Sequence, residues 1–184
     1  MSAASVLAVC VVHQLRPDAG PVGTTAIDKR PVSGRVRVGA YGVYADVQAD
    51  RKNHGGLDQA VYAYSQEDAE YWADELGREL PSGWFGENLR VDGMNVNAAK
   101  VGERWQIGRS VIVEVTTSRH PCQTFARWVG GDDERGWVKR FAQAGRLGAY
   151  LRVISTGRIE AGDEITVLER PADAPTILEV YRAR

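Results

Sequence analysis

The segment Arg119-His120-Pro121-Cys122 places a thiol close to a permanent cation. Upstream, residues 111–117 are apolar and β-branched, which is typical of a strand. Proline cannot donate to a sheet ladder, so we expect the strand to end here and to present Cys122 at the sheet rim. With Arg119 nearby to favour its thiolate, Cys122 could bind a soft metal or act as a nucleophile. It could equally be a small hydrophobe in a core.

Three polar segments elsewhere have residue types that suit a ligand site. Lys29 and Arg30 precede a proline and could hold a phosphate, or form a solvated turn. The glycine pair after His54 could form an anion-binding nest, with His54 facing the ligand, or an ordinary hairpin turn. Asn88 offers donors and acceptors to the edge of a heterocycle. Its neighbour Glu87 could pair with a cation in the site or cap a turn.

The histidines and cysteines do not predict a metal cage built from protein ligands alone. The three histidines show no ligand-type spacing, and neither HExxH nor CxxC is present. One thiolate would suffice if the metal arrived already chelated inside an organic cofactor whose sulfurs fill most of its coordination sphere. Such a site would need Cys122 and an anion-binding cradle, and the polar segments described above could supply the cradle.

The composition predicts a single domain. The chain has 184 residues with 43% hydrophobic content. Its 23 basic and 24 acidic residues give a net charge of -1, so we expect neither nucleic acid nor a membrane surface as partner. Two cysteines are too few for a disulfide scaffold, and Cys10 lies in an apolar run where a buried thiol is expected. That run, residues 5–12, lacks the features of a leader peptide and predicts a first strand, so we expect a cytoplasmic protein.

The elements that must position these residues are mainly strands. Many short β-branched runs and 20 glycines favour a closed or partly closed barrel. The expected strands span residues 5–12, 34–40, 60–64, 103–107, 110–117, 149–155, 163–168 and 176–182.

Helical periodicity is confined to a few segments. A first apolar stripe follows Ser65, an expected N-cap, and ends before Pro81; its members are Ala69, Trp72, Ala73, Leu76 and Leu80. A second stripe begins at Trp137 and stops near Gly145. A short helix is also expected over residues 123–128, directly after Cys122. The aromatic residues of the two stripes are expected to pack in the core.

Taken in order, these segments resemble the MOSC domain family, named for the C-terminal domain of molybdenum cofactor sulfurase. The resemblance covers about residues 5–170, through residues 25–32, 54–61, 85–89, 101–108, 119–122 and 150–154. It is closest to small stand-alone bacterial members. It implies one MOSC domain over residues 1–184, folded as a MOSC-type β-barrel with a few short helices, with 171–184 as a terminal strand or tail.

The resemblance also implies a site. Cys122 would be the catalytic residue and the protein ligand to the molybdenum of a molybdopterin-type cofactor. The cofactor-binding residues that it implies are Lys29, His54, Asn88, Arg119, Cys122 and Arg152. Among these, the three cations would meet the pterin phosphate and ring system, while the histidine and the asparagine would line the same pocket.

The chain departs from the family pattern at a few positions. Ala45 stands where a glycine is usual, directly before Asp46. Trp84 stands where a small residue is common and could narrow the substrate mouth. No helical C-terminal extension follows residue 184, so we expect no partner to dock through one.

The leading functional hypothesis is a molybdenum-dependent oxidoreductase that reduces N-hydroxylated small molecules. No GxGxxG dinucleotide fingerprint is present, so electrons would come from a separate reductase. The alternative is a module that carries the cofactor, or carries sulfur as a persulfide on Cys122, without turnover of its own. A third reading is a ligand-binding barrel that has lost metal chemistry.

Overall fold

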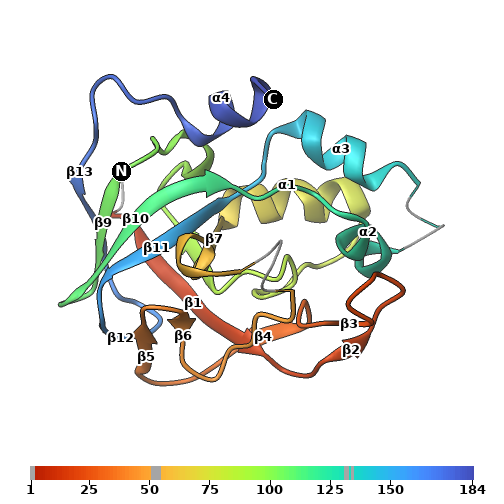
Figure 1. Cartoon of the computed structure of the whole chain (residues 1–184), viewed down its shortest axis with the longest axis horizontal. Helices are drawn as coiled ribbons and strands as arrows, with labels where there is room; N and C mark the ends of the chain where they lie inside the picture. Colours follow the sequence, from red (N-terminus) through yellow and green to blue (C-terminus); the bar gives the residue numbers. More distant parts are fainter. Residues whose placement is uncertain (1–2, 51–54, 131–132, 134) are drawn as a thin grey trace.

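A large mixed sheet forms the centre of the computed structural model, which describes residues 3–50, 55–130, 133 and 135–184 (Figure 1). Within these residues the sheet has eight strands, in the order β13-β9-β10-β11-β7-β8-β1-β4. Their bounds are β1 Ser5–Val12, β4 Lys29–Pro31, β7 Val61–Ser65, β8 Leu89–Asp92, β9 Arg104–Ile107, β10 Val111–Ser118, β11 Ala149–Ser155 and β13 Ile165–Glu169. Only β7 and β8 run parallel among these described neighbours, because the helix α1 (Gln66–Leu76) connects them as a crossover.

Two smaller sheets lie beside the large one. The first joins β12 (Gly157–Ile159), β5 (Val36–Gly39) and β6 (Gly42–Val43). The second is the hairpin of β2 (Arg16–Pro17) and β3 (Thr24–Thr25). The strands β2, β3, β4, β6, β8 and β12, of two to four residues each, were not expected from the sequence. The expectations for β1, β5, β7, β9, β10, β11 and β13 are confirmed to within about two residues.

The sequence predicted a closed or partly closed barrel, and a closed barrel is wrong. In the described part of the chain, β13 and β4 are the two ends of the sheet and do not pair with each other. An isolated bridge between Ser5 and Glu164 joins the start of β1 to the segment before β13. It is flanked by backbone hydrogen bonds from Val6 N to Asp163 O at 2.9 Å, from Gly162 N to Val6 O at 2.8 Å and from Ile165 N to Ala4 O at 2.7 Å. The architecture is therefore a large mixed sheet without a complete closing ladder.

Three helices pack together on one side of the sheet (Figure 1). They are α1, α2 (Gln123–Val129) and α3 (Trp137–Ala144), which confirms the helices expected after Ser65, after Cys122 and from Trp137. The Ser65 hydroxyl accepts a 3.2 Å hydrogen bond from Asp68 N, as an N-cap should. Gly77, with φ 61, ends α1 four residues before Pro81, because a left-handed glycine cap stops a helix first.

The C-terminal segment is a helix and not the expected strand over 176–182. The helix α4 (Ile177–Arg182) begins with a capping box, in which Thr176 and Glu179 bond to each other's backbone N–H. Ile177 N also donates to Ala99 O at 2.9 Å, which fixes α4 to the short helix η2 (Val96–Ala98). The capping signal, and not the apolar alternation, therefore determines the structure of this segment. No helix in the described ranges is long and apolar enough to cross a membrane.

The core has an aliphatic part along the sheet and an aromatic part under the helices. Phe125 of α2 and Phe141 of α3 pack with ring centroids 5.0 Å apart, and Trp72 of α1 packs 4.7 Å from Trp137. All four side chains are buried, as the helical stripes predicted. Burying each aromatic side chain contributes on the order of 2 kcal/mol, so this cluster holds the start of α2 firmly against the sheet.

Candidate functional site

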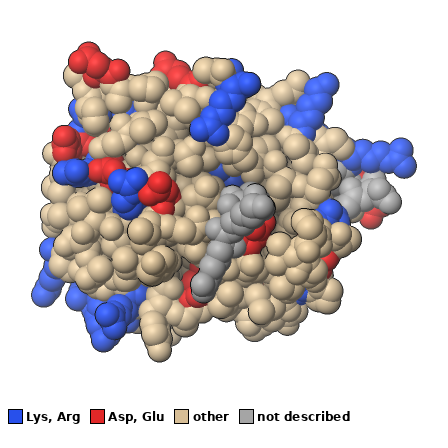
Figure 2. Space-filling model, in the orientation of Figure 1, with Lys and Arg blue, Asp and Glu red and all other residues tan. Residues whose placement is uncertain are grey.

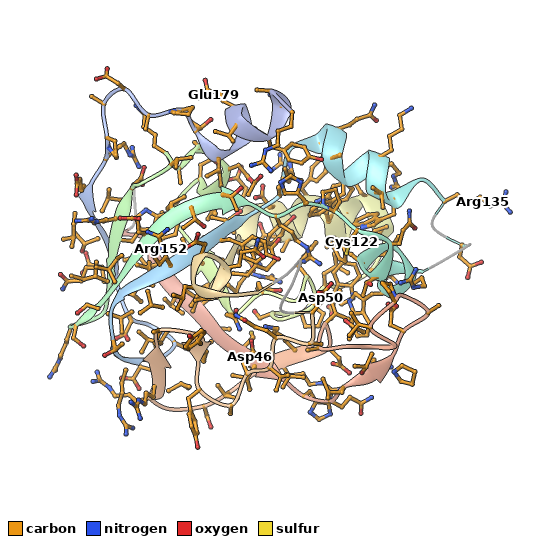
Figure 3. The ribbon with its side chains drawn as sticks, in the orientation of Figure 1. Asp46, Asp50, Cys122, Arg135, Arg152 and Glu179 are labelled. Atoms are coloured by element: carbon orange, nitrogen blue, oxygen red, sulfur yellow. The ribbon has the colours of Figure 1, made fainter. Side chains whose placement is uncertain are left out.

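A cleft opens between the β2–β3 hairpin, the loop after β6 and the start of α2. It encloses about 920 Å³ of empty space, including its mouth. Cys122, Asp46 and Asp50 all line this cleft, and Figure 3 shows them across the middle of the molecule. Lys29, Asn88 and Arg119 line it as well, so four of the six residues expected to bind a cofactor meet here.

Cys122 is placed where the sequence predicted. The strand β10 ends at Ser118, and Cys122 has extended backbone immediately before α2. Its side chain does not cap the helix, is half-buried and is not in a disulfide, so the thiol faces the cleft without being enclosed. Cys122 also packs against the aromatic core cluster, as expected if it is a small hydrophobe, so it has both a core contact and a face on the cleft.

Arg119 is a buried cation at the back of the cleft. Its side chain stacks on the ring of Phe125 at 4.2 Å and on that of Tyr62 at 5.2 Å, and Nη1 donates to Phe85 O. The Nε atom has no hydrogen-bond partner, and no Asp or Glu of the described residues forms an ion pair with this guanidinium. Burial works to lower the pKa of Arg119, but its electrostatic coupling to the ionisable groups of Tyr62, Tyr150 and Cys122 outweighs burial and raises that pKa. The cleft therefore contains a permanent positive charge that forms no ion pair with a carboxylate of the described residues, while the carboxylates of Asp18, Asp46 and Asp50 line other parts of the cleft.

Lys29 and Asn88 belong to a connected polar network centred on Asp46. The Lys29 ammonium forms an ion pair with Asp46, and Asn88 Nδ2 donates to the same carboxylate at 2.8 Å. The other Asp46 oxygen accepts from Val12 N at 2.9 Å, and Asn88 Oδ1 accepts from Tyr62 N at 3.1 Å. Asp46 thus neutralises Lys29, and the Asn88 side chain joins β7 to β1, since its Nδ2 also donates to Cys10 O at 3.2 Å. We expected exposed cations here, yet both Lys29 and Arg119 are largely buried.

Two phenols were missed by the sequence reading. Tyr62 and Tyr150 both line the cleft, with ring centroids 5.2 Å apart. Burial is the main cause that raises the pKa of each phenol, so both remain protonated at neutral pH. Tyr62 donates to Leu147 O at 2.7 Å, whereas no hydrogen bond is formed by the Tyr150 hydroxyl within the described residues. Tyr150 lies two residues from Arg152 on an expected strand, which was the available signal.

The loop of the β2–β3 hairpin forms one wall of the cleft and is fastened to α2. The Asp18 carboxylate accepts from Arg127 Nε at 2.8 Å, from Arg127 Nη2 at 2.7 Å and from Thr124 Oγ1 at 2.9 Å. These bonds, with Arg127 the largest cause, lower the pKa of Asp18 to about 2. Nothing in the sequence around residue 18 indicated this contact, since its partner lies 109 residues away.

The remaining expected site residues lie elsewhere. Arg152 does not line the cleft: it pairs with Asp58 at 2.8 Å and Glu114 at 3.2 Å, and Figure 3 shows it on β11, away from Cys122. His54 lies outside the described residues. Trp84 does not narrow the mouth as expected, because its ring packs edge-on against Phe85 at 4.8 Å.

Of the two roles that the sequence left open for Glu87, a cation partner in the site or a turn cap, the structure shows the turn cap. It is fully buried and accepts from Gly83 N at 2.7 Å, which caps a turn. It also pairs at 2.6 Å with Arg90, a buried cation outside the cleft lining. Across the described ranges, no group of three or more His, Cys, Asp or Glu side chains is arranged to hold a metal ion.

The chain belongs to the MOSC domain family, whose model matches residues 50–166. An uncharacterised protein of Bacillus subtilis (strain 168), YflK, is 35% identical over 146 residues, which cover 79% of this chain and 64% of YflK. A protein named reductase from Gibberella moniliformis (strain M3125 / FGSC 7600) is 34% identical over 165 residues, covering 86% of this chain. That match spans only 28% of the fungal protein, so this chain corresponds to less than two thirds of either relative.

The fold is also that of a solved relative. The crystal structure of YiiM from Geobacillus stearothermophilus superimposes with a TM-score of 0.76 over 97% of this chain and 82% of that chain, at 29% identity. The mainly β architecture with few helices is therefore shared with a known member of this structural group.

Proposed function

We propose that this protein binds a molybdenum cofactor through Cys122 and reduces N-hydroxylated small molecules with electrons from a separate donor protein. The observation that carries the proposal is one cleft in which a half-buried thiol, outside any disulfide, lies near Arg119, a buried cation without an ion-pair partner in the described part of the chain. A thiolate is a ligand that soft metals prefer. A buried cation without a carboxylate is costly in an empty cleft and useful beside an anionic ligand.

The residues present fit a cofactor of this kind. Its metal would need one soft ligand from the protein, which Cys122 can supply, and its anionic groups would need a cation, which Arg119 can supply. The unpartnered Arg119 Nε is buried and available as a donor to such a group. Gly86 lines the same cleft at φ 75, and a Cβ there would lie 3.2 Å from Ile27 Cγ1, so this part of the wall favours glycine. Lys29 would act mainly by fixing Asp46.

In the reaction that we propose, two electrons and two protons convert the N-hydroxyl group of the substrate into an N–H group and one water molecule, with cleavage of the N–O bond. The bound cofactor would supply the oxygen-removal chemistry. The protein would exclude bulk water with the 18–25 hairpin and keep the thiolate of Cys122 charged through Arg119. The protonated Tyr150 hydroxyl would donate a hydrogen bond to the substrate oxygen. Arg152 is held by two carboxylates outside the cleft and has no role in the proposed reaction.

The electrons would come from a separate flavoprotein reductase. The chain has no dinucleotide fingerprint, and its fungal relative named reductase is several times longer. A cytoplasmic location is part of the proposal, since neither cysteine of the chain is in a disulfide.

Protein produced in a cofactor-synthesising host tests the proposal. We expect bound molybdenum and pterin by mass spectrometry, and reduction of an N-hydroxylated purine or an amidoxime with a chemical reductant or a flavoprotein reductase. NADPH alone should give no turnover; turnover with it alone would reveal a nucleotide site. Full molybdenum loading without turnover under any reductant would favour the carrier alternative, and a persulfide on the half-buried Cys122 would then be sought by mass spectrometry.

A further inference from the structure

A second groove lies on the opposite side of the loop that bears Asp46. Its floor is formed by the apolar side chains of Val11, Val32 and Val36. Its rim carries Arg35, Arg37, Tyr44 and Arg158. Figure 2 shows basic side chains gathered at the lower left of the molecule, over β5 and β12. With a net charge of -1 for the whole chain, this concentration of arginine is local.

Arg37 and Arg158 are a strained arrangement of like charges. They lie directly opposite each other in the antiparallel pair of β5 and β12. Residues opposite in such a pair have Cβ atoms about 5 Å apart, and like charges there destabilise the sheet. Arg35 is offset by Glu160 at 2.8 Å, but neither member of the opposed pair forms an ion pair or side-chain hydrogen bond with any described residue. The groove therefore presents two exposed guanidinium groups with no internal counter-charge.

The aromatic residues at this groove strengthen the case for a macromolecular partner. Tyr44, directly after β6, is 71% exposed on the rim, and Tyr41, in the turn between β5 and β6, is 73% exposed. Arginine and tyrosine around an apolar floor are the residues enriched at the centres of protein interfaces. Large exposed aromatic rings cost solubility unless a partner covers them.

The groove and the cleft share a wall. Ala45 lines the groove and its neighbour Asp46 lines the cleft, so one turn separates the two. Ala45 is held at φ 69, the only left-handed non-glycine residue in the described ranges. Asp46 in turn holds Lys29 and Asn88. A protein seated in the groove would therefore lie against the back of the network that builds the cleft.

We propose that this groove docks the acidic face of the electron-donor protein. The inference rests on the proposed function, because it names the partner that delivers electrons to that same site. Unpaired arginines would steer an acidic partner to the groove and would make docking sensitive to ionic strength. Tyr44 and the valine floor would supply the apolar contact.

The test compares charge reversal in the groove with charge reversal elsewhere, in cofactor-loaded protein. The double variant Arg37→Glu/Arg158→Glu is matched by Lys139→Glu/Arg182→Glu, which makes the same charge change on α3 and α4. Each is assayed with dithionite and with an NADPH-dependent flavoprotein reductase of acidic surface. We expect the groove variant to raise the KM for the reductase about tenfold or more and to lose its salt dependence, while dithionite turnover is unchanged. The matched variant should change neither.

A neutral variant guards against misfolding. Arg37→Gln/Arg158→Gln removes the like-charge pair, so its free energy of unfolding should rise while its KM for the reductase also rises. The docking inference alone would be overturned if wild type and the groove variants had equal KM values for the reductase. It would also be overturned if wild type turned over with dithionite but not with the reductase. No turnover by wild type with dithionite would overturn the proposed function and the inference together.

Discussion

Stability alone does not explain why Arg119 is buried. A buried cation with one backbone hydrogen bond and no carboxylate among the described residues costs desolvation free energy that its stacking on Phe125 only partly returns. We interpret this as stability given up for anion binding.

Arg119→Met is therefore predicted to separate stability from binding. The variant should leave the free energy of unfolding of cofactor-free protein unchanged or raise it by about 1 kcal/mol, because the Met side chain can still pack on Phe125. Molybdenum retention should fall several-fold, because the buried charge is lost. Denaturant titration and metal analysis measure the two. Lower stability with full molybdenum would make Arg119 a purely structural residue.

Ala45 is predicted to gain stability when it becomes glycine. At φ 69 an alanine carries about 1 kcal/mol of left-handed strain, of which the greater chain entropy of glycine offsets part. Ala45→Gly should therefore raise the melting temperature slightly. Ala142→Gly, in the interior of α3, is the matched control and should lower stability by about 1 kcal/mol. The same sign for both changes would show that Ala45 is unstrained.

At the residue scale, sequence succeeded where the determinant was local. Pro121 and the β-branched run before it placed Cys122 at a strand end without any tertiary information. The role of Asp46 was out of reach, because its partners Lys29 and Asn88 lie 17 and 42 residues away. Arg152 was misplaced for the same reason: nothing local shows that Asp58, 94 residues distant, holds it outside the cleft.

At the scale of elements, the Asp18 carboxylate fastens the β2–β3 hairpin to α2, beside the stacking of Arg16 on Trp128. Asp18 has its pKa lowered from 3.8 in an unfolded chain to about 2, chiefly by hydrogen bonds from Arg127. A lowered folded-state pKa means that this contribution to stability is complete above about pH 4 and is lost as pH falls toward 2.

Asp18→Asn should therefore lower the free energy of unfolding by about 1–2 kcal/mol at pH 7. The loss is this small because Arg127 is half-exposed and solvent partly screens the pair. The difference from wild type should shrink as the pH falls from 4 to 2.5 in urea titrations. Asp92→Asn, an exposed position on β8, is the matched control and should change the free energy of unfolding at pH 7 by less than about 0.5 kcal/mol. A cost for Asp18→Asn that is independent of pH would show that the carboxylate charge is not what fastens the hairpin.

Local signals also decided which elements were predicted correctly. Ser65 gave the start of α1, but the capping box at Thr176 was overlooked in favour of alternation, and the last segment was taken for a strand. Strands of two or three residues carry no period of their own. One of them, β4, forms because β1 offers it a partner.

At the scale of the whole molecule, the sequence predicted a mainly β fold but not its openness. Whether a sheet closes depends on how its end strands meet, and here β1 meets the segment around the start of β13 through one bridge at Ser5 and three flanking backbone hydrogen bonds, without a full ladder. The cleft forms where long-range contacts bring the β2–β3 hairpin, the loop after β6 and the start of α2 together.

The central claim, that Cys122 is the protein ligand to a molybdenum cofactor, is tested most directly by metal analysis of two cysteine variants from a cofactor-producing host. Cys122→Ser should abolish molybdenum retention without loss of fold, because the thiol is half-buried and a hydroxyl is a poor soft-metal ligand. Cys10→Ala should keep its molybdenum and lose about 1–2 kcal/mol of stability, because Cys10 is fully buried in β1. Molybdenum in Cys122→Ser equal to that in wild type would contradict the account.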